Sequence, residues 1–218
     1  FIAFKTDPAA GAKGISLFLV EKGTPGFTVG PSEEKLGCRS SRTTALHFDH
    51  CLIRDDQRIG PVNGGFKIAM YGLVSGRLGM AAMGLGIAEA ALQDAVSYAN
   101  TRVVFGKPLV SLFAIQEKIA DMYVQIQAAE HMVRAAAEKR DTQAEYSLEA
   151  STAKLFVSRV ITDICHQALQ IYGGHGYMKY NDVERYARDA RLLDIGVGAS
   201  EVLKMVVGMT IAKDIRTT

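Results

Sequence analysis

The chain has 218 residues, of which 48% are apolar and 22% are charged, as is ordinary for a soluble globular protein of one large or two modest domains. Its formal net charge of +2 gives no sign of a polyanionic partner, and no basic stripe indicates nucleic-acid binding. No apolar run reaches the length of a bilayer-spanning helix and no signal peptide is visible, so we expect no membrane span.

Residues 1–61 are predicted to hold short β-strands separated by turn-forming segments. The strand-like runs are FIAF (1–4), ISLFLV (15–20), FTV (27–29) and ALHFD (45–49). This region is too short to form a comfortable sheet domain alone, and the chain starts at Phe1 inside a strand-like run. We therefore expect residues 1–61 to be the C-terminal part of a β domain, within a fragment of a longer protein.

From Gly64 onward, the apolar residues follow the period of helices. Three stripes have spacings of three and four residues, and they run from Leu78 to Ala95, from Ile115 to Val133 and from Val157 to Ile171. Such stripes are typical of the buried faces of long, nearly antiparallel helices.

A fourth helix is predicted from about Ser200, a good N-cap, to Asp214. Its apolar residues cover most of its circumference, which predicts burial in the bundle centre or in a subunit interface. The predicted fold is mainly α: a four-helix up-down bundle over residues 62–218, preceded by the last strands of a β domain over residues 1–61.

The cysteines and histidines do not indicate a metal site. Cys38, Cys51 and Cys165 have no CxxC spacing, and their odd number indicates reduced thiols in a reducing, cytoplasmic compartment. In HFDHC, alternation along a strand places His47 and His50 on opposite faces. Carboxylate or thiolate partners at ligand spacing are missing, so we expect no bound metal.

Two turns between predicted helices could approach a ligand. TRVVFGKPL (101–109) is a basic turn whose backbone amides and Arg102 suit a phosphate, although a solvated turn is the simpler interpretation of Arg102 alone. QIYGGHGY (170–177) ends a helix with paired glycines, which allow close approach of a ligand. A helix C-cap followed by a tight turn explains the same glycines equally well.

A third segment, VERYARDARLLDIGVGASE (183–201), leads from a charged helix into a glycine-rich loop and the last helix. A loop of this kind at a helix N-terminus is typical of a site for oxygen-rich ligands. We interpret the charged residues before the loop as an ion-pair network that positions it. These residues are Arg185, Arg188, Asp189 and Arg191.

These segments, taken in order, resemble the acyl-CoA dehydrogenase family across the whole chain. The ordered motifs are TPGFTVG, EKLGCRSSRTTALHFDHCLI, GGFKIAM, SGRLGMAAMGLGIAEAAL, TRVVFGKPL, AIQEKIADMY, EASTAKLF, QIYGGHGY, VERYARDARLLDIG and GASE. The resemblance covers the second half of the family's middle β domain and its C-terminal bundle. It implies an FAD-dependent α,β-dehydrogenation of an acyl-CoA, a homotetramer, electron-transfer flavoprotein as acceptor and, in a eukaryote, the mitochondrial matrix.

The resemblance also implies roles for individual residues. Arg77 matches an arginine that contacts the CoA arm, and Gly198 is expected at the substrate. Arg102 matches an arginine that reaches the FAD pyrophosphate of a neighbouring subunit, whereas Phe113 replaces a glutamine that contacts the flavin. The residues expected to bind FAD are Arg102, Phe105, Gln170, Gly173, Gly174, Ala199 and Ser200.

The catalytic base that the family uses is missing from both of its usual positions. The family places this carboxylate in the loop before the last helix or, in a minority, just before the substrate arginine. These positions hold Val197 and Gly76, and neither residue can exchange a proton. We considered four replacements and assign the base to none of them: Tyr71, Ser75, Asp194 and Glu201.

Several explanations of the missing base stay open at this point. Val197 is an engineered substitution, or the protein runs another flavin reaction on acyl-CoA, of the reductase or desulfinase type. Alternatively, the chain is an inactive partner subunit or scaffold, or the base comes from outside these residues. The catalytic residue is therefore left unassigned.

Overall fold

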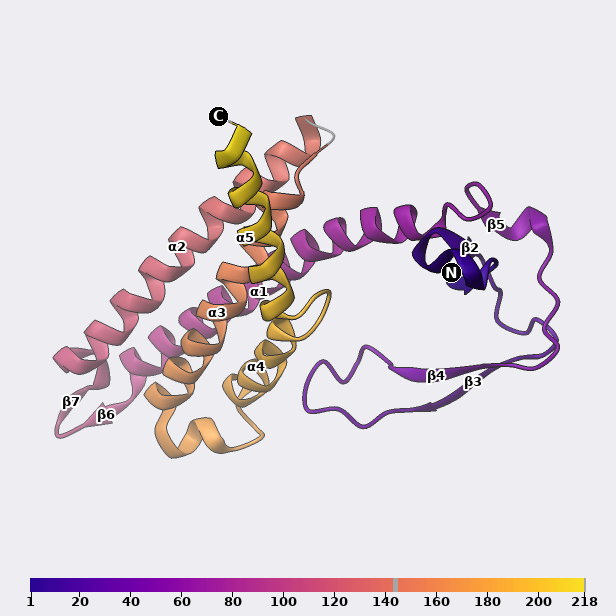
Figure 1. Ribbon diagram of the computed structural model, residues 1–218. Helices are drawn as coiled ribbons and strands as arrows, with labels where there is room; N and C mark the ends of the chain where they lie inside the picture. Colours follow the sequence, from indigo (N-terminus) through magenta and orange to yellow (C-terminus); the bar gives the residue numbers. More distant parts are fainter. Residues whose placement is uncertain (143–144, 218) are drawn as a thin grey trace. The chain divides into compact units, whose positions relative to one another are not determined.

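The computed structural model describes residues 1–142 and 145–217 (Figure 1). It divides into two compact units. The first unit comprises Phe1–Lys35 and Arg39–Leu73, and the second comprises Leu36–Cys38 and Val74–Thr218. The division falls inside the long helix α1 (Gly65–Thr101). The domain boundary predicted between residues 61 and 62 stays a prediction. The last residue of the second predicted domain, Thr218, lies outside the described residues.

The first unit is built from short antiparallel strands. Strands β1 (Ile2–Lys5), β2 (Ile15–Phe18) and β5 (Arg58–Ile59) form one sheet in the order β1-β2-β5. Strand β3 (Phe27–Ser32) pairs with β4 (Thr44–Phe48). The four predicted strand-like runs are thus confirmed as strands. Sequence reasoning missed β5, because two residues are too few to show an alternating pattern.

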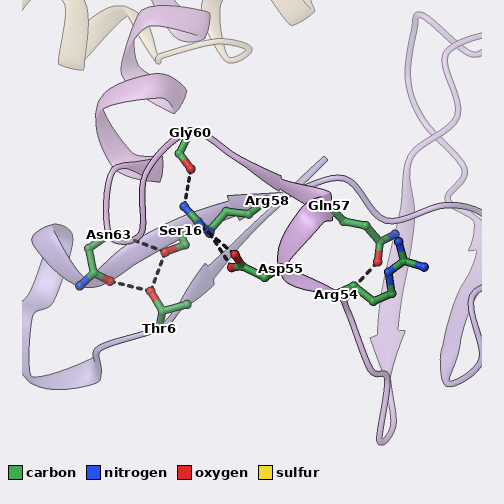
Figure 2. Close-up of polar contacts among 8 residues, drawn as sticks. All are labelled: Thr6, Ser16, Arg54, Asp55, Gln57, Arg58, Gly60 and Asn63. Carbon is green, nitrogen blue, oxygen red and sulfur yellow. Dashed lines mark hydrogen bonds and ion pairs between the residues drawn. The ribbon is translucent and has the colours of Figure 1, made fainter.

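Polar side chains fix the approach to α1 within this unit (Figure 2). The fully buried Ser16 hydroxyl accepts a hydrogen bond from the backbone amide of Asn63 at 2.8 Å and lies 2.7 Å from the Thr6 hydroxyl. Thr6 in turn donates to the Asn63 side chain at 2.7 Å. Asn63 has a φ of 63°, a left-handed conformation that asparagine tolerates better than most residues. These bonds tie the turn before α1 to β2.

The second unit is helical and contains the four predicted long helices, three of which the apolar stripes located. These are the rest of α1, α2 (Phe113–Thr142), α3 (Ser147–Tyr172) and α5 (Ser200–Thr217). A shorter helix, α4 (Asp182–Ala190), precedes α5, and a small hairpin of β6 (Val103–Val104) and β7 (Lys107–Pro108) joins α1 to α2. Figure 1 shows α1, α2 and α3 as long rods with their connections at the ends. The mainly α fold is therefore confirmed.

The core of this unit is made of the predicted stripes. Many of the positions on α1 are alanines, which let neighbouring helices approach closely, while α2 and α3 contribute larger side chains. Fully or almost fully buried stripe residues are Ala81, Ala88, Ala95, Met122, Ile126, Ala129, Val157, Ile161, Ile164 and Ala168.

Helix α5 departs from the prediction. Of its large apolar residues only Leu203 is fully buried, whereas Met205, Met209 and Ile215 are 57%, 67% and 70% exposed. Burial at the centre of the bundle is therefore wrong for this chain, because α5 covers α3 with one face and leaves the other open. The alternative of a subunit interface stays a prediction. Ser200 is the first helical residue rather than the N-cap.

Helix α1 meets the length and composition criteria for a membrane span. Its most apolar 18-residue window has a mean hydropathy of 1.3, with 17% of the window buried. The sequence-based expectation that no segment is long and apolar enough to cross a bilayer is therefore wrong for this helix, by length and composition. The observation is weak support for a span, because core helices of water-soluble proteins meet the same criteria and α1 supplies six buried residues to the core.

Two glycines on α1 give a matched test of this packing. A Cβ at Gly84 would lie 2.7 Å from Val157 Cγ1 and 2.2 Å from Leu193 Cδ2, whereas nothing lies within 4 Å at Gly86. We expect Gly86→Ala to raise the free energy of unfolding by about 0.5–1 kcal/mol, through helix propensity. Gly84→Ala should lower it by about 1–3 kcal/mol, through overpacking. Chemical denaturation of both variants measures this, and equal effects would contradict the packing described.

Candidate functional site

The candidate residues fall into two separate groups in the second unit. One group surrounds the loop between η5 (Arg191–Asp194) and α5, together with Arg77 on α1. The other lies at the hairpin after α1 and at the end of α3. Arg77 and Thr101 are 24 residues apart on one helix, so the groups are separated by about 36 Å along α1.

In the first group, the two positions expected to carry the base face each other. A Cβ built on Gly76 would lie 2.9 Å from Val197 Cγ1, so the valine side chain rests on the backbone of α1. Val197 has a φ of 53°, a conformation that is strongly disfavoured for a β-branched residue. Gly198 follows with a φ of 105°. The apolar contact leaves no proton-exchanging group at either position.

Arg77 lies beside this contact with part of its guanidinium unsatisfied. Nη1 donates to the Ser151 hydroxyl at 3.1 Å, but Nε is buried and has no hydrogen-bond partner among the described residues. A Cβ on Gly198 would lie 3.9 Å from this Nε. A buried donor without a partner is rare and indicates a place where a ligand oxygen can bind.

The other candidate bases are hydrogen-bonded to neighbouring residues or are exposed to solvent. Asp194 accepts hydrogen bonds from Arg191 Nη1 at 2.6 Å and from Ser200 Oγ at 2.9 Å. The Ser75 hydroxyl lies 2.7 Å from the hydroxyl of the buried Tyr146. Glu201 is exposed in the first turn of α5. Tyr71 is 65% exposed. The structure therefore assigns the role of base to none of the four.

A cavity of about 700 Å³ opens between α3, η5 and α5. Ala199 and Ser200 line it, together with charged residues of both signs, but Arg77 and Val197 are not among its described lining residues. Ala199 is partly exposed on this side of the loop, whereas Ser200 is 8% exposed. The charged residues of the lining are Arg159, Arg191, Asp194, Glu201 and Lys204.

Sequence reasoning missed a buried polar stripe on α3. Ser151, Lys154 and Ser158 are all 0% exposed, and their spacing of three and four residues places them on one helix face. Lys154 Nζ donates to Gly198 O at 2.7 Å, and Ser158 Oγ donates to Leu193 O at 2.9 Å. The available signal was that these polar residues share the helical period of the apolar stripe beside them.

The environment of Lys154 shifts its titration. Burial lowers the pKa of the Lys154 ammonium, Asp194 and Glu201 act to raise it, and Arg77 lowers it further. The net effect is a lowered pKa, so folding makes proton release easier.

In the second group, the two turns meet at one end of the bundle. The Tyr98 ring of α1 stacks on the Tyr172 ring of α3 at 4.1 Å, which brings the hairpin after α1 close to the turn after α3 (Figure 1). Gly173 caps α3 with a φ of 56°, so the C-cap interpretation of this glycine is confirmed. Gln170, Gly173 and Gly174 are exposed, and a Cβ on either glycine would meet nothing within 4 Å.

The hairpin presents its tip outward. Phe105 and Gly106 have φ values of 50° and 77°, which is the left-handed pair of a two-residue hairpin turn. Phe105 is 94% exposed, and the Arg102 side chain beside it is exposed too. An exposed guanidinium next to bare backbone has the chemistry to hold a phosphate.

The predicted ion-pair network before the loop is wrong in its detail. Arg185, Arg188 and Arg191 each pair locally, with Asp182, Glu184 and Asp194 respectively. Asp189 and Arg188 also fasten the segment Leu36–Cys38, because the Cys38 amide donates to Asp189 Oδ1 at 2.6 Å and Arg188 Nη1 donates to Leu36 O at 2.9 Å. Such local pairs are favoured by the three- and four-residue spacing on a helix surface.

Comparison with known proteins gives a consistent result. A family model described as the C-terminal domain of acyl-CoA dehydrogenase matches residues 63–212. The chain is 46% identical over 212 residues to the short-chain specific acyl-CoA dehydrogenase of Bos taurus mitochondria, covering 97% of the chain and 52% of that relative. The chain therefore spans about half the length of the curated relatives it matches.

Solved structures agree with this. Butyryl-CoA dehydrogenase from Megasphaera elsdenii superposes with a TM-score of 0.93 at 43% identity, over 96% of this chain and 55% of that one. A structure described as the electron transferring flavoprotein of Acidaminococcus fermentans gives 0.94 at 40% identity, over the same shares of the two chains.

The lowered pKa of Lys154 predicts a pH-dependent stability. The unfolded chain holds this proton more tightly than the folded one, so the charged group destabilises the fold below its lowered pKa. This cost disappears as the pH rises toward 10.5. The free energy of unfolding of the wild type should therefore rise relative to Lys154→Met between neutral pH and pH of about 10. Urea denaturation at several pH values measures this, and a flat or falling difference would contradict it.

Proposed function

We propose, starting from the fact that this chain belongs to the acyl-CoA dehydrogenase family, that it forms the C-terminal part of an FAD-dependent enzyme that dehydrogenates an acyl-CoA between its α- and β-carbons. The observation that carries the proposal is the convergence of Arg77, Gly198 and the two base positions, Gly76 and Val197, at one place. On this proposal, the residues around Arg77 bind the acyl-CoA, and the hairpin after α1 and the turn after α3 bind FAD.

On the substrate side, Arg77 provides the recognition. Its buried Nε lacks a partner in the described residues, and an acceptor oxygen of the acyl-CoA would satisfy it. Gly198 allows a ligand close to the loop backbone, because its left-handed φ and missing side chain leave the surface open. This pair orients the thioester relative to position 197.

On the cofactor side, the exposed residues fit FAD. Arg102 would hold the pyrophosphate, Gln170 and the exposed backbone of Gly173 and Gly174 would lie along the cofactor, and the exposed ring of Phe105 would contact it too. Ala199 and Ser200 would contact FAD at the other group. When bound, FAD supplies the acceptor for the hydride that leaves the β-carbon.

The separation of the groups supports a homo-oligomer. About 36 Å of α1 separates Arg77 from the hairpin that carries Arg102, so the two groups of candidate residues lie far apart on one chain. Two copies would therefore share each cofactor, and the exposed apolar face of α5 is suited to an interface. We extend the proposal to a homotetramer that passes its electrons to electron-transfer flavoprotein, in the cytoplasm or, in a eukaryote, the mitochondrial matrix.

The valine determines how well the chain performs the reaction. Removal of the α-proton needs a base, and Val197 and Gly76 provide none. General-base catalysis contributes about 10²- to 10⁴-fold to a rate, so dehydrogenation by this chain should be slow unless a base comes from elsewhere. Reduction of an enoyl-CoA is the second candidate: it adds a hydride from reduced FAD at the β-carbon and a proton at the α-carbon, and because Val197 and Gly76 have no proton to give, water would have to supply that proton.

Restoring a carboxylate at position 197 tests the proposal. We expect Val197→Glu to speed the reduction of bound FAD by butyryl-CoA by about 10²- to 10⁴-fold, measured as loss of flavin absorbance without oxygen. Glutamate lacks the β-branch of valine, so the left-handed backbone should be retained more easily.

Val197→Gln is the matched control, because it has the same shape without a base. If Val197→Gln is as fast as Val197→Glu, or if Val197→Glu binds FAD without any gain, dehydrogenation at this site is contradicted. Oxidation of reduced flavin by an enoyl-CoA in the wild type would then favour the reductase reaction.

Removing the arginine of the hairpin tests the cofactor assignment. A charge-assisted hydrogen bond to phosphate contributes about 1.5–3 kcal/mol, so Arg102→Ala should weaken FAD binding by about ten- to a hundredfold. Lys107→Ala removes the same charge from the exposed end of the same hairpin and should change the affinity little. Titration with FAD, followed by fluorescence, compares them. Equal affinities of the two variants would show that Arg102 does not hold the pyrophosphate.

A further inference from the structure

We propose that Lys154 is a positioning residue of the acyl-CoA site, which sets the conformation of the loop at residues 195–199 by holding the carbonyl of Gly198. The ligand that the loop serves rests on the proposed function. The claim that Lys154 fixes the loop depends only on contacts between residues of the second unit.

The contact is short and completely enclosed. Lys154 is 0% exposed, and its Nζ lies 2.7 Å from Gly198 O. Hydrogen bonds with a charged donor are about twice as strong as neutral ones, and burial strengthens the electrostatic part further. The bond joins residues that are 44 positions apart, so it fixes the loop to α3 rather than to its own flanks.

Lys154 acts together with its two neighbours on the same face of α3. Ser151 accepts from Arg77 Nη1 at 3.1 Å, and Ser158 donates to Leu193 O at 2.9 Å. One helix face thus holds the substrate arginine, the loop and the turn that precedes the loop. Because α3 is a rigid, buried element, these three parts keep a fixed spacing.

The backbone that Lys154 holds would not keep its conformation unaided. Val197 and Gly198 are consecutive left-handed residues, and such strain persists only where the surroundings hold it in place. Gly198 O belongs to the residue directly after Val197. A bond to this carbonyl therefore fixes the direction in which the side chain of residue 197 leaves the loop, toward Gly76.

Burying a lysine at this position costs free energy, because its charge is removed from water. Its buried ammonium faces Asp194 from η5, Glu201 from α5 and the like charge of Arg77 from α1. A methionine would fill similar space without desolvating a charge. The specific gain from lysine is a donor long enough to reach the loop carbonyl, which points to a positioning role beyond filling space.

Hydrogen exchange tests the hold directly. The Gly196 amide donates to Leu192 O at 2.7 Å and the Leu203 amide to Ala199 O at 3.0 Å, so both report opening of the loop. In the purified protein, Lys154→Met should speed exchange of these two amides by about ten- to a hundredfold. Amides in the middle of α2 should change much less.

Lys118→Met is the control, because Lys118 Nζ donates to Gln167 on the same helix α3, away from the loop. It should leave exchange at Gly196 and Leu203 unchanged. If Lys154→Met does not fold, Lys154→Gln, which keeps a polar group but cannot reach the carbonyl, should give the same local increase. Unchanged exchange in the loop, or a uniform increase over all helices, would overturn the proposal.

A kinetic arm separates this proposal from the proposed function. In the Val197→Glu background, adding Lys154→Met should lower the rate of flavin reduction at saturating butyryl-CoA by about tenfold or more, with a smaller effect on the KM for butyryl-CoA. A change in KM alone would contradict positioning of residue 197. If Val197→Glu shows no flavin reduction, the proposed function fails, while the exchange result still decides the role of Lys154.

Discussion

A lysine ammonium that is removed from water needs hydrogen-bond acceptors around it. In this protein that requirement connects helix α3 to the loop before α5. Lys154 is fully buried on α3 and donates to the carbonyl of Gly198. The same helix face holds Arg77 through Ser151 and the preceding turn through Ser158. The loop, Arg77 and the turn before the loop are therefore held by one helix, beside the apolar stripe that packs into the hydrophobic core.

A second constraint is the length of α1. The helix carries Arg77 near one end and leads into the Arg102 hairpin at the other, about 36 Å away. The two groups of candidate residues are thus kept apart within one chain. The proposal of a cofactor shared between copies is based on this distance and on the exposure of the residues at the hairpin and at Gly173.

The sequence predicts those parts of the molecule in which a periodic pattern is long. The apolar stripes locate α1, α2 and α3, and the β-like runs locate β1 to β4, because burial of one face imposes a regular spacing. The prediction fails where the partner is distant in sequence. Central burial of α5 is wrong because composition does not tell which neighbour covers a helix, and the arginines before the loop pair locally. The helical period could have placed Lys154 on the buried side of α3, but its partner, a backbone carbonyl, has no sequence signature.

On the proposed function, the thioester binds beside an apolar pair, Gly76 and Val197, where the family places a carboxylate. A crystal structure of the protein with FAD and a non-reacting acyl-CoA analogue tests this most directly. We expect the α-carbon to lie against the Val197 side chain, with Arg77 contacting the ligand and no carboxylate close to that carbon. A carboxylate from any segment beside the α-carbon, or a thioester bound away from the loop, would contradict it.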